Sequence, residues 1–241
     1  MGRRKRKNPE DTDITPFVIA ALGVGSVLLL WPKNASANIG NNTMNNSTVP
    51  TLETGSQIMS RTSGMSQSAR EQEFIRLVNA GNVPSWTFTT VQIRSNLAVT
   101  PDFIAVGTDE DYIWIPLTPS GAVQILGPRR MRLPMRSEAD AIYAHAVAIG
   151  NNIPFQSFTP AHGQTRWGNT AMTASRDKIL RALNGRRGII DGHKKYVLGE
   201  RNGKVLIYGG HYADGSQVQP YSDIHDASYL DYSHGIRGVV S

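Results

Sequence analysis

The stretch HKKYVLGERNGKVLIYGGHYADG, residues 193–215, decides the fold of the carboxyl-terminal part of the chain. Two runs rich in β-branched and aromatic residues, 195–198 and 204–208, flank Asn202-Gly203, a dipeptide typical of tight hairpin turns. We therefore expect two paired strands joined by this turn. Residues 229–240 have a similar composition and predict a further strand in the same region.

Helix and strand signals are mixed upstream of this stretch. Strands are expected at 86–93, 103–106 and 112–115, because these runs are β-branched or aromatic and are bounded by Pro or Gly. Capping residues and glycine stops predict helices at 69–80, 118–127, 137–149 and 174–183, the first with a capping box formed by Ser68 and Glu71. The sequence thus predicts one α+β domain, with mixed helices and strands followed by a β-rich carboxyl-terminal sheet.

The amino-terminal residues predict a membrane anchor outside that domain. Residues 1–13 contain five consecutive cations, Arg3–Lys7, and residues 14–31 form an uncharged run of 18 residues, long enough to cross a bilayer as a helix. The positive-inside rule then places residues 1–13 in the cytoplasm and the remaining chain in the periplasm or outside the cell. Ala35-Ser36-Ala37 also has the form of a signal-peptidase site, so a secreted protein cleaved after Ala37 stays open as an alternative.

A polar tether is expected between the anchor and the folded part. Residues 32–68 are rich in Asn, Ser and Thr and carry few large apolar side chains, so burial cannot offset their loss of conformational entropy. We expect residues 32–68 to be disordered and the exported α+β domain to span residues 69–241.

Charge and cysteine content exclude several classes of protein. The net charge is +6, but residues 69–241 carry 18 basic and 15 acidic residues, so half of the excess belongs to the much shorter amino-terminal segment. We therefore expect no nucleic-acid partner. The chain has no cysteine, which excludes a disulfide framework, a thiolate nucleophile and a cysteine–zinc site.

Histidines mark the candidate site, because four of the six lie between residues 193 and 234. Imidazole is a common metal ligand and a general base near neutral pH, so histidines at neighbouring strand ends could form an acid–base cluster or hold a divalent metal. A solvated or structural role for each histidine is the alternative. The candidate catalytic residues are His193, His211, His225, His234, Ser233 and Asp231, and the other aspartates that could orient imidazole rings are Asp191, Asp223 and Asp226.

The same residues resemble the carboxyl end of a family of uncharacterised exported bacterial and phage proteins. Members of this family combine a Gly-His-Lys-Lys stretch, a Tyr-Gly-x-His strand end, a Gln-Pro-x-Ser turn, a further histidine and a closing Asp-Tyr-Ser-His-Gly-x-Arg, and the corresponding residues here are GHKKYVL and GKVLIYGGHYADGSQVQPYSDIHDASYLDYSHGIRGVV. The likeness extends over most of residues 99–241. It implies export and one intact domain.

A shorter likeness covers IHDASYLDYSHGIRGVV, which is similar to the L,D-transpeptidase motif without its cysteine. Without a thiolate the transpeptidase mechanism cannot operate. The likeness implies cell-wall peptide or glycan as a candidate substrate. Lys194, Lys195 and Arg237 could then bind an anionic group, such as the carboxylate of a peptidoglycan stem peptide, and a solvated strand face is the alternative for the lysines.

Two functions follow from these expectations. The first is a membrane-anchored exported protein that acts on the cell envelope, in particular a peptidoglycan hydrolase using the carboxyl-terminal histidines. The second is a non-catalytic membrane-anchored binding or structural protein, a component of the envelope or of a virion. Both have the membrane as a partner through a single span, and the hydrolase has a cell-wall polymer as its substrate.

Overall fold

The hairpin predicted from residues 193–215 is present in the computed structural model, which describes residues 51–241. Strands β6 (Lys195–Arg201) and β7 (Lys204–His211) pair antiparallel, and Asn202 and Gly203 between them both have positive φ, at 52° and 72°. Such a turn matches the right-handed twist of the two strands. Strand β8 (Gln217–Ser222) pairs with β7, and β9 (His234–Gly235) pairs with β6 in parallel, giving the sheet order β8-β7-β6-β9.

The strand expected over residues 229–240 is wrong. Only two short pieces are extended, β9 and β10 (Val239–Val240), and they belong to different sheets. Strand β10 lies between β2 (Leu97–Val99) and β5 (Met131–Arg132), and β1 (Val91–Arg94) completes that sheet. Gly235 in β9 is closely packed, because an added Cβ would lie 2.5 Å from the Phe103 ring.

A third sheet consists of β3 (Ala105–Gly107) and β4 (Tyr112–Trp114), and every residue in it is buried. The expected strands at 103–106 and 112–115 therefore lie close to the observed ones. The strand expected at 86–93 begins only at Val91, because the amides of Thr87 and Thr89 bond to carbonyls three residues earlier and form turns.

Four of the five α-helices in the described part correspond to predicted ones. They are α2 (Gln67–Asn79), α3 (Pro119–Leu126), α4 (Arg136–Ala148) and α5 (Asn169–Leu183). A short 3-10 helix, η1 (Gly127–Arg129), follows α3. The cap of α2 differs from the prediction, since the side chain of Ser66, not that of Ser68, accepts from the amide of Ala69.

Helix α1 (Gly55–Arg61) lies within the segment that we expected to be a disordered tether. Thr54 and Gln57 form a capping box at its start, and Ile58 and Met59 are buried in the core. The two buried apolar side chains gave no clear period in the sequence, and the amide of Gly55 also bonds to the distant carbonyl of Asp111 at 2.6 Å. The folded domain therefore begins before residue 69.

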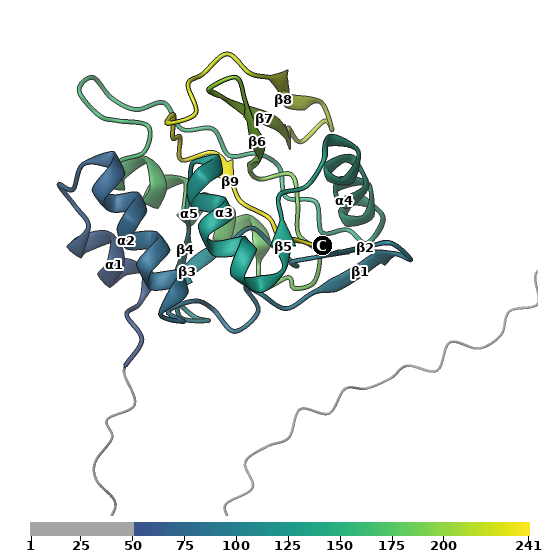
Figure 1. The fold of residues 1–241 in the computed structure, drawn as a ribbon, viewed down its shortest axis with the longest axis horizontal. Coiled ribbons are helices and arrows are strands. Elements are labelled where there is room, and N and C mark those ends of the chain that lie inside the picture. The colour runs from purple at the N-terminus through teal and green to yellow at the C-terminus, as the bar shows by residue number, and fades with distance from the viewer. Residues whose placement is uncertain (1–50) are drawn as a thin grey trace, which may run out of the picture. The chain divides into compact units, whose positions relative to one another are not determined.

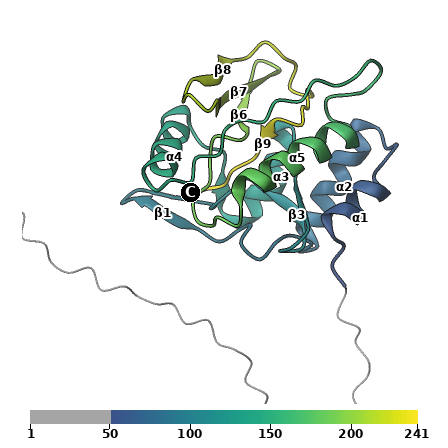
Figure 2. The same cartoon turned by 180° about the vertical axis from the view of Figure 1, so that it is seen from behind.

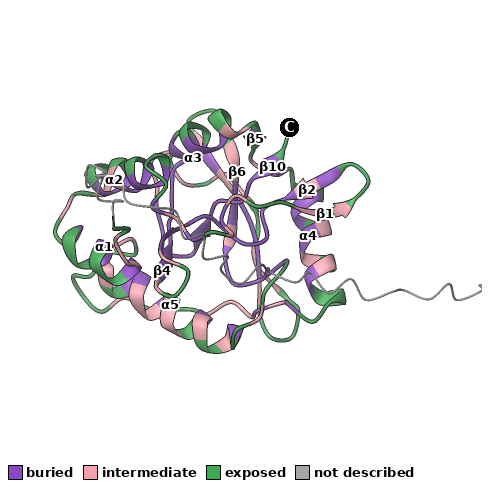
Figure 3. Cartoon of the chain, turned by 90° about the horizontal axis from the view of Figure 1, so that it is seen from below, coloured by how far each residue is buried: buried purple, intermediate pink, exposed green. Residues whose placement is uncertain are grey.

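The elements pack around two apolar clusters. One gathers side chains of α1, α2, α3 and β7, and the other those of α4, α5, β2 and β4. Helices α1 and α2 lie at one end of the domain, α3 lies next to α2 towards the middle, and α4 lies at the other end beside β1 and β2 (Figure 1). Figure 2 shows α5 beside α1, and Figure 3 shows the buried strands between α3 and α5.

Among the residues that the structure describes, no helix combines the length and hydropathy needed to cross a membrane. The predicted cytoplasmic tail 1–13 and span 14–31 lie outside the described residues, as does the tether as far as residue 50.

Candidate functional site

The hairpin sheet separates His225 from His211, which lie near opposite ends of β7. His193 lies two residues before β6, and its neighbour Gly192 accepts a hydrogen bond from the amide of His211, while His234 in β9 pairs with Lys195. The carbonyl of His225 instead accepts from Val205, near the hairpin turn. Six residues along β7 separate Val205 from His211, a distance of about 20 Å. The four histidines therefore do not form the single cluster that we expected.

His225 and His234 are brought together by one tyrosine. The ring of His225 stacks on Tyr229 with centroids 4.0 Å apart, and the ring of His234 meets the same tyrosine edge-on at 5.5 Å. We call the surrounding group the Asp231 cluster, and it consists of Arg166, Lys195, His225, Tyr229, Asp231 and His234.

The carboxylate of Asp231 is the acceptor at the centre of this cluster. It accepts hydrogen bonds from Arg166 Nε at 2.9 Å, from the Tyr229 hydroxyl at 3.1 Å and from the Ser233 amide at 2.8 Å. Burial alone would raise the pKa of Asp231, but interaction with His234 and the bond from Ser233 outweigh burial and lower it. Asp231 is therefore anionic at neutral pH.

His234 is neutral at the same pH. Its side chain is 1% exposed, and burial lowers its pKa to about 4 despite the opposing attraction of Asp231. Lys195, which is half-buried, also has a pKa lowered by burial. Burial raises the pKa of Tyr229 to about 12, so its hydroxyl keeps its proton. The cluster thus combines an anion, a neutral imidazole and a hydroxyl donor within one small volume.

His193 lies in a separate aromatic environment. Its ring is 5.2 Å from both Phe103 and Trp114, and its Nε2 is 3.3 Å from Oδ1 of Asp102. The distance suits an ion pair, but neither ring nitrogen of His193 has a hydrogen bond within residues 51–241, so the N–H and the oxygen are poorly aligned. Asp102 was not singled out from the sequence.

His211 stacks on Tyr143, with ring centroids 3.4 Å apart, and burial lowers the pKa of His211.

The aspartates that we expected to orient imidazole rings do not bond to them. Asp191 accepts from the Tyr196 hydroxyl at 2.6 Å, and Asp223 and Asp226 form exposed ion pairs with Arg201 and Lys204.

Two of the three expected substrate-binding cations are buried. The Nζ of Lys194 donates to the carbonyl of Tyr232 at 2.6 Å, and burial lowers the pKa of Lys194 to about 8. The guanidinium of Arg237, which is 0% exposed, donates to the carbonyls of Thr100 and Ile190. Both side chains therefore point into the domain, where they donate to main-chain carbonyls, and not toward solvent as we expected for a substrate contact. Lys195 remains open to a ligand.

Unsatisfied polar atoms concentrate on the residues that the sequence singled out. Within residues 51–241, eleven buried side-chain nitrogen or oxygen atoms lack a hydrogen-bond partner, and seven of them belong to five sequence-predicted residues. Those five residues are His193, His211, Ser233, His234 and Arg237. Each such atom costs about 1–3 kcal/mol, so native proteins retain few without a reason.

Metal binding has no prearranged ligand set in the described residues, since no three His, Asp or Glu side chains of residues 51–241 lie close enough together to hold an ion. The arrangement of the Asp231 cluster suits proton transfer instead.

Arg166 and Tyr229 were missed as members of the cluster. The motif Tyr-Leu-Asp-Tyr-Ser-His contained a usable signal for Tyr229, whereas Arg166 reaches Asp231 across 65 positions.

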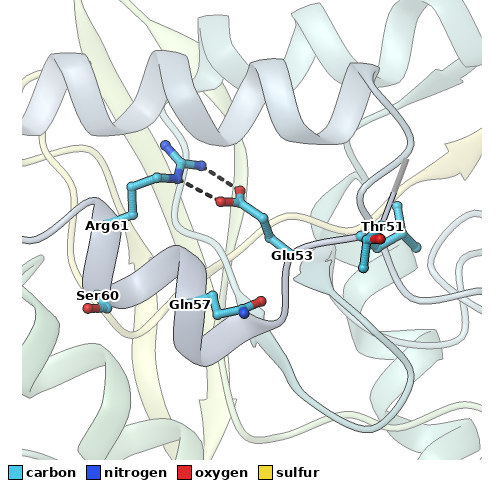
Figure 4. Close-up of a pocket in the computed structure, with 6 residues that line it drawn as sticks. Thr51, Glu53, Gln57, Ser60 and Arg61 are labelled. Carbon is cyan, nitrogen blue, oxygen red and sulfur yellow. Dashed lines mark hydrogen bonds and ion pairs between the residues drawn. The ribbon is translucent and has the colours of Figure 1, made fainter. Parts of the chain in front are cut away.

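A pocket of about 460 Å³ is formed by residues far in sequence from the Asp231 cluster (Figure 4). It is lined only by residues 51–61, and the guanidinium of Arg61 closes on Glu53 through two hydrogen bonds of 2.8 and 2.7 Å. None of the sequence-predicted site residues lines it, so we assign it no part in the site.

Comparison with known proteins finds no match for this chain among protein-family models, curated proteins or solved structures.

Proposed function

We propose that the chain is a membrane-anchored exported protein whose folded domain acts on the cell envelope as a peptidoglycan hydrolase. The observation that carries this proposal is the concentration of unsatisfied buried polar atoms on Ser233, His234 and neighbouring sequence-predicted residues. Perturbed titratable groups gathered beside such atoms are typical of catalytic centres. Support for export comes from the amino-terminal sequence, with five cations before an uncharged run of 18 residues.

The groups of the Asp231 cluster have complementary roles in this proposal. Neutral His234 accepts a proton from the attacking group, and anionic Asp231 stabilises the imidazolium that results. The Tyr229 hydroxyl stays protonated and fixes the carboxylate. Arg166 and Lys195 are the cations accessible from solvent, and they bind an anionic group of the cell-wall polymer.

The test compares variants of the full-length chain, purified in detergent, for release of dye from labelled peptidoglycan sacculi. His234→Gln and Asp231→Asn should each lower the rate by about 100-fold or more, as expected for loss of an acid–base group. The matched control is His162→Gln, which changes an exposed histidine outside the cluster and should leave the rate unchanged. Melting temperatures show that each variant is folded. Dye release that is absent, or that is equal in all variants, contradicts the proposal.

A non-catalytic envelope or virion protein is the second candidate, and burial favours it. Ser233, His234 and Arg237 are each no more than 1% exposed, so a polymer reaches them only if the surrounding loops move. This candidate predicts that the folded chain sediments with sacculi, releases no dye, and binds equally well after His234→Gln.

A further inference from the structure

A second pocket lies on the domain away from the Asp231 cluster, with a volume of about 200 Å³. Its lining comes from the turn before β1, the start of the 101–104 segment, β4 and the loop after α5. No member of the Asp231 cluster contributes to it. The pocket therefore needs an explanation of its own.

Two aromatic rings form its apolar wall. Trp86 and Tyr112 meet edge to face with centroids 5.2 Å apart. The indole N–H of Trp86 is buried and has no acceptor in the described part of the chain. Burial raises the pKa of Tyr112 to about 12, so its hydroxyl remains a neutral donor. The wall thus offers an apolar surface with unsatisfied donor capacity.

A carboxyl group lies at the buried side of the same pocket. Asp102 is 3% exposed and accepts from the Phe103 amide at 2.6 Å and the Trp114 indole at 3.1 Å. Its nearest basic contact is His193 at 3.3 Å, and it forms no ion pair with a lysine or arginine of residues 51–241. The buried ammonium of Lys194 attracts Asp102 only from beyond ion-pair distance, so a cationic ligand group in direct contact with the carboxylate would be favoured.

A guanidinium lies at the exposed side. Arg187 lines the pocket near the Tyr112 hydroxyl, and it forms no ion pair with any residue that the structure describes. The pocket lining therefore includes a carboxylate, a guanidinium and two aromatic rings. That arrangement complements a small molecule with both charges and an apolar body.

We propose that this pocket binds an amino-acid-like zwitterion. The ammonium group of the ligand points to Asp102, its carboxylate to Arg187, and its apolar side chain packs against Trp86 and Tyr112. The aromatic faces add a cation–π attraction for the ammonium, and the indole N–H supplies a donor for the carboxylate. This proposal does not depend on hydrolase activity at the Asp231 cluster.

The test is isothermal titration calorimetry of the full-length chain in detergent with three probes. L-leucine carries both charges, N-acetyl-L-leucine lacks the ammonium, and isoamylamine lacks the carboxylate. We expect L-leucine to bind with Kd below about 1 mM, and each analogue to bind at least about tenfold more weakly. Absence of L-leucine binding at about 10 mM by the folded chain, or equal affinity for all three probes, overturns the proposal.

Variants separate the two charged groups of the pocket. Arg187→Gln should weaken L-leucine binding about tenfold and leave isoamylamine binding unchanged, and Asp102→Asn should weaken both. Arg181→Gln, which changes an exposed arginine on α5, is the matched control and should bind as the unmodified chain does. If Asp102→Asn does not fold, Arg187→Gln and the two analogues still test both charged groups. Equal L-leucine binding by Arg187→Gln and Arg181→Gln rejects the assigned orientation and with it the zwitterion site.

Discussion

Arg237 is a cationic side chain that folding removes wholly from solvent. Its guanidinium donates to two main-chain carbonyls, those of Thr100 and Ile190, and lies 4.6 Å from the centre of the Phe103 ring. These contacts tie the segment between β9 and β10 to two distant loops. The position of Arg237 after Ser-His-Gly suggested a substrate contact, but sequence spacing could not show which way the side chain points.

Replacing Arg237 should therefore lower stability and not merely substrate affinity. In a fragment spanning residues 51–241, Arg237→Met leaves the two carbonyls without donors, and we expect the free energy of unfolding to fall by about 2–4 kcal/mol. Urea denaturation measures the change. Arg181→Met, at an exposed position, should unfold at the same urea concentration as the unmodified fragment. Equal midpoints for both variants would show that Arg237 contributes no structural support.

His234 makes stability depend on pH. Its folded-state pKa of about 4 lies below the unfolded value of 6.5, so the unfolded chain binds the proton first as pH falls. The stability that neutral His234 provides is fully present above pH 6.5 and is lost between pH 6.5 and 4, by about 3 kcal/mol. Melting temperatures recorded across this range should fall less steeply for His234→Gln. Parallel curves for the two proteins would contradict this assignment.

At the level of elements, α1 was expected to be part of a tether but belongs to the core. Ile58 is 0% exposed and Met59 is 5% exposed, and both join the apolar cluster beneath α2 and α3. We expect a fragment starting at residue 66 to melt well below one starting at residue 51. Ile58→Ala should cost about 2–5 kcal/mol, whereas Ser60→Ala on the exposed side of α1 should cost little. Equal melting of the two fragments would show that α1 packs only weakly.

Elements with strong local signals could be predicted, and those without them could not. The β6–β7 turn and the Thr118 cap with Pro119 at the start of α3 depend on residues next to each other in the chain. Strands β9 and β10 have only two residues each, which is too short for a periodic pattern, and their partners β6 and β2 are distant in sequence. Their positions are set by tertiary packing at Gly235 and Gly238, where an added Cβ would lie within 2.7 Å of neighbouring side chains.

For the molecule as a whole, the sequence indicated individual residues of interest but not how folding groups them. Histidines beside glycines marked the positions where unsatisfied polar atoms occur, as at His193 and His234. Which of them share a cluster depends on strand register and on Tyr229, and neither can be obtained from spacing alone. Asp102 gave no signal, since it stands in a loop before a short strand and meets His193 only in the folded domain.

The arrangement of the full chain at the membrane is a separate prediction. Because five cations precede the uncharged run 14–31, we expect residues 1–13 in the cytoplasm and the folded domain outside. Protease added to intact spheroplasts should remove the folded domain and leave an amino-terminal tag protected. Full protection of the domain would reverse the proposed orientation, and its release into the medium without protease would indicate cleavage after Ala37.

The central proposal, that the folded domain cleaves cell-wall polymer at the Asp231 cluster, is tested most directly by mass spectrometry of soluble products. Purified sacculi are incubated with the full-length chain in detergent or with its folded His234→Gln variant. We predict fragments that share one newly formed chemical end with the unmodified chain, and at least about 100-fold less of them with the variant. No such fragments, or the same amount from both proteins, would contradict the account.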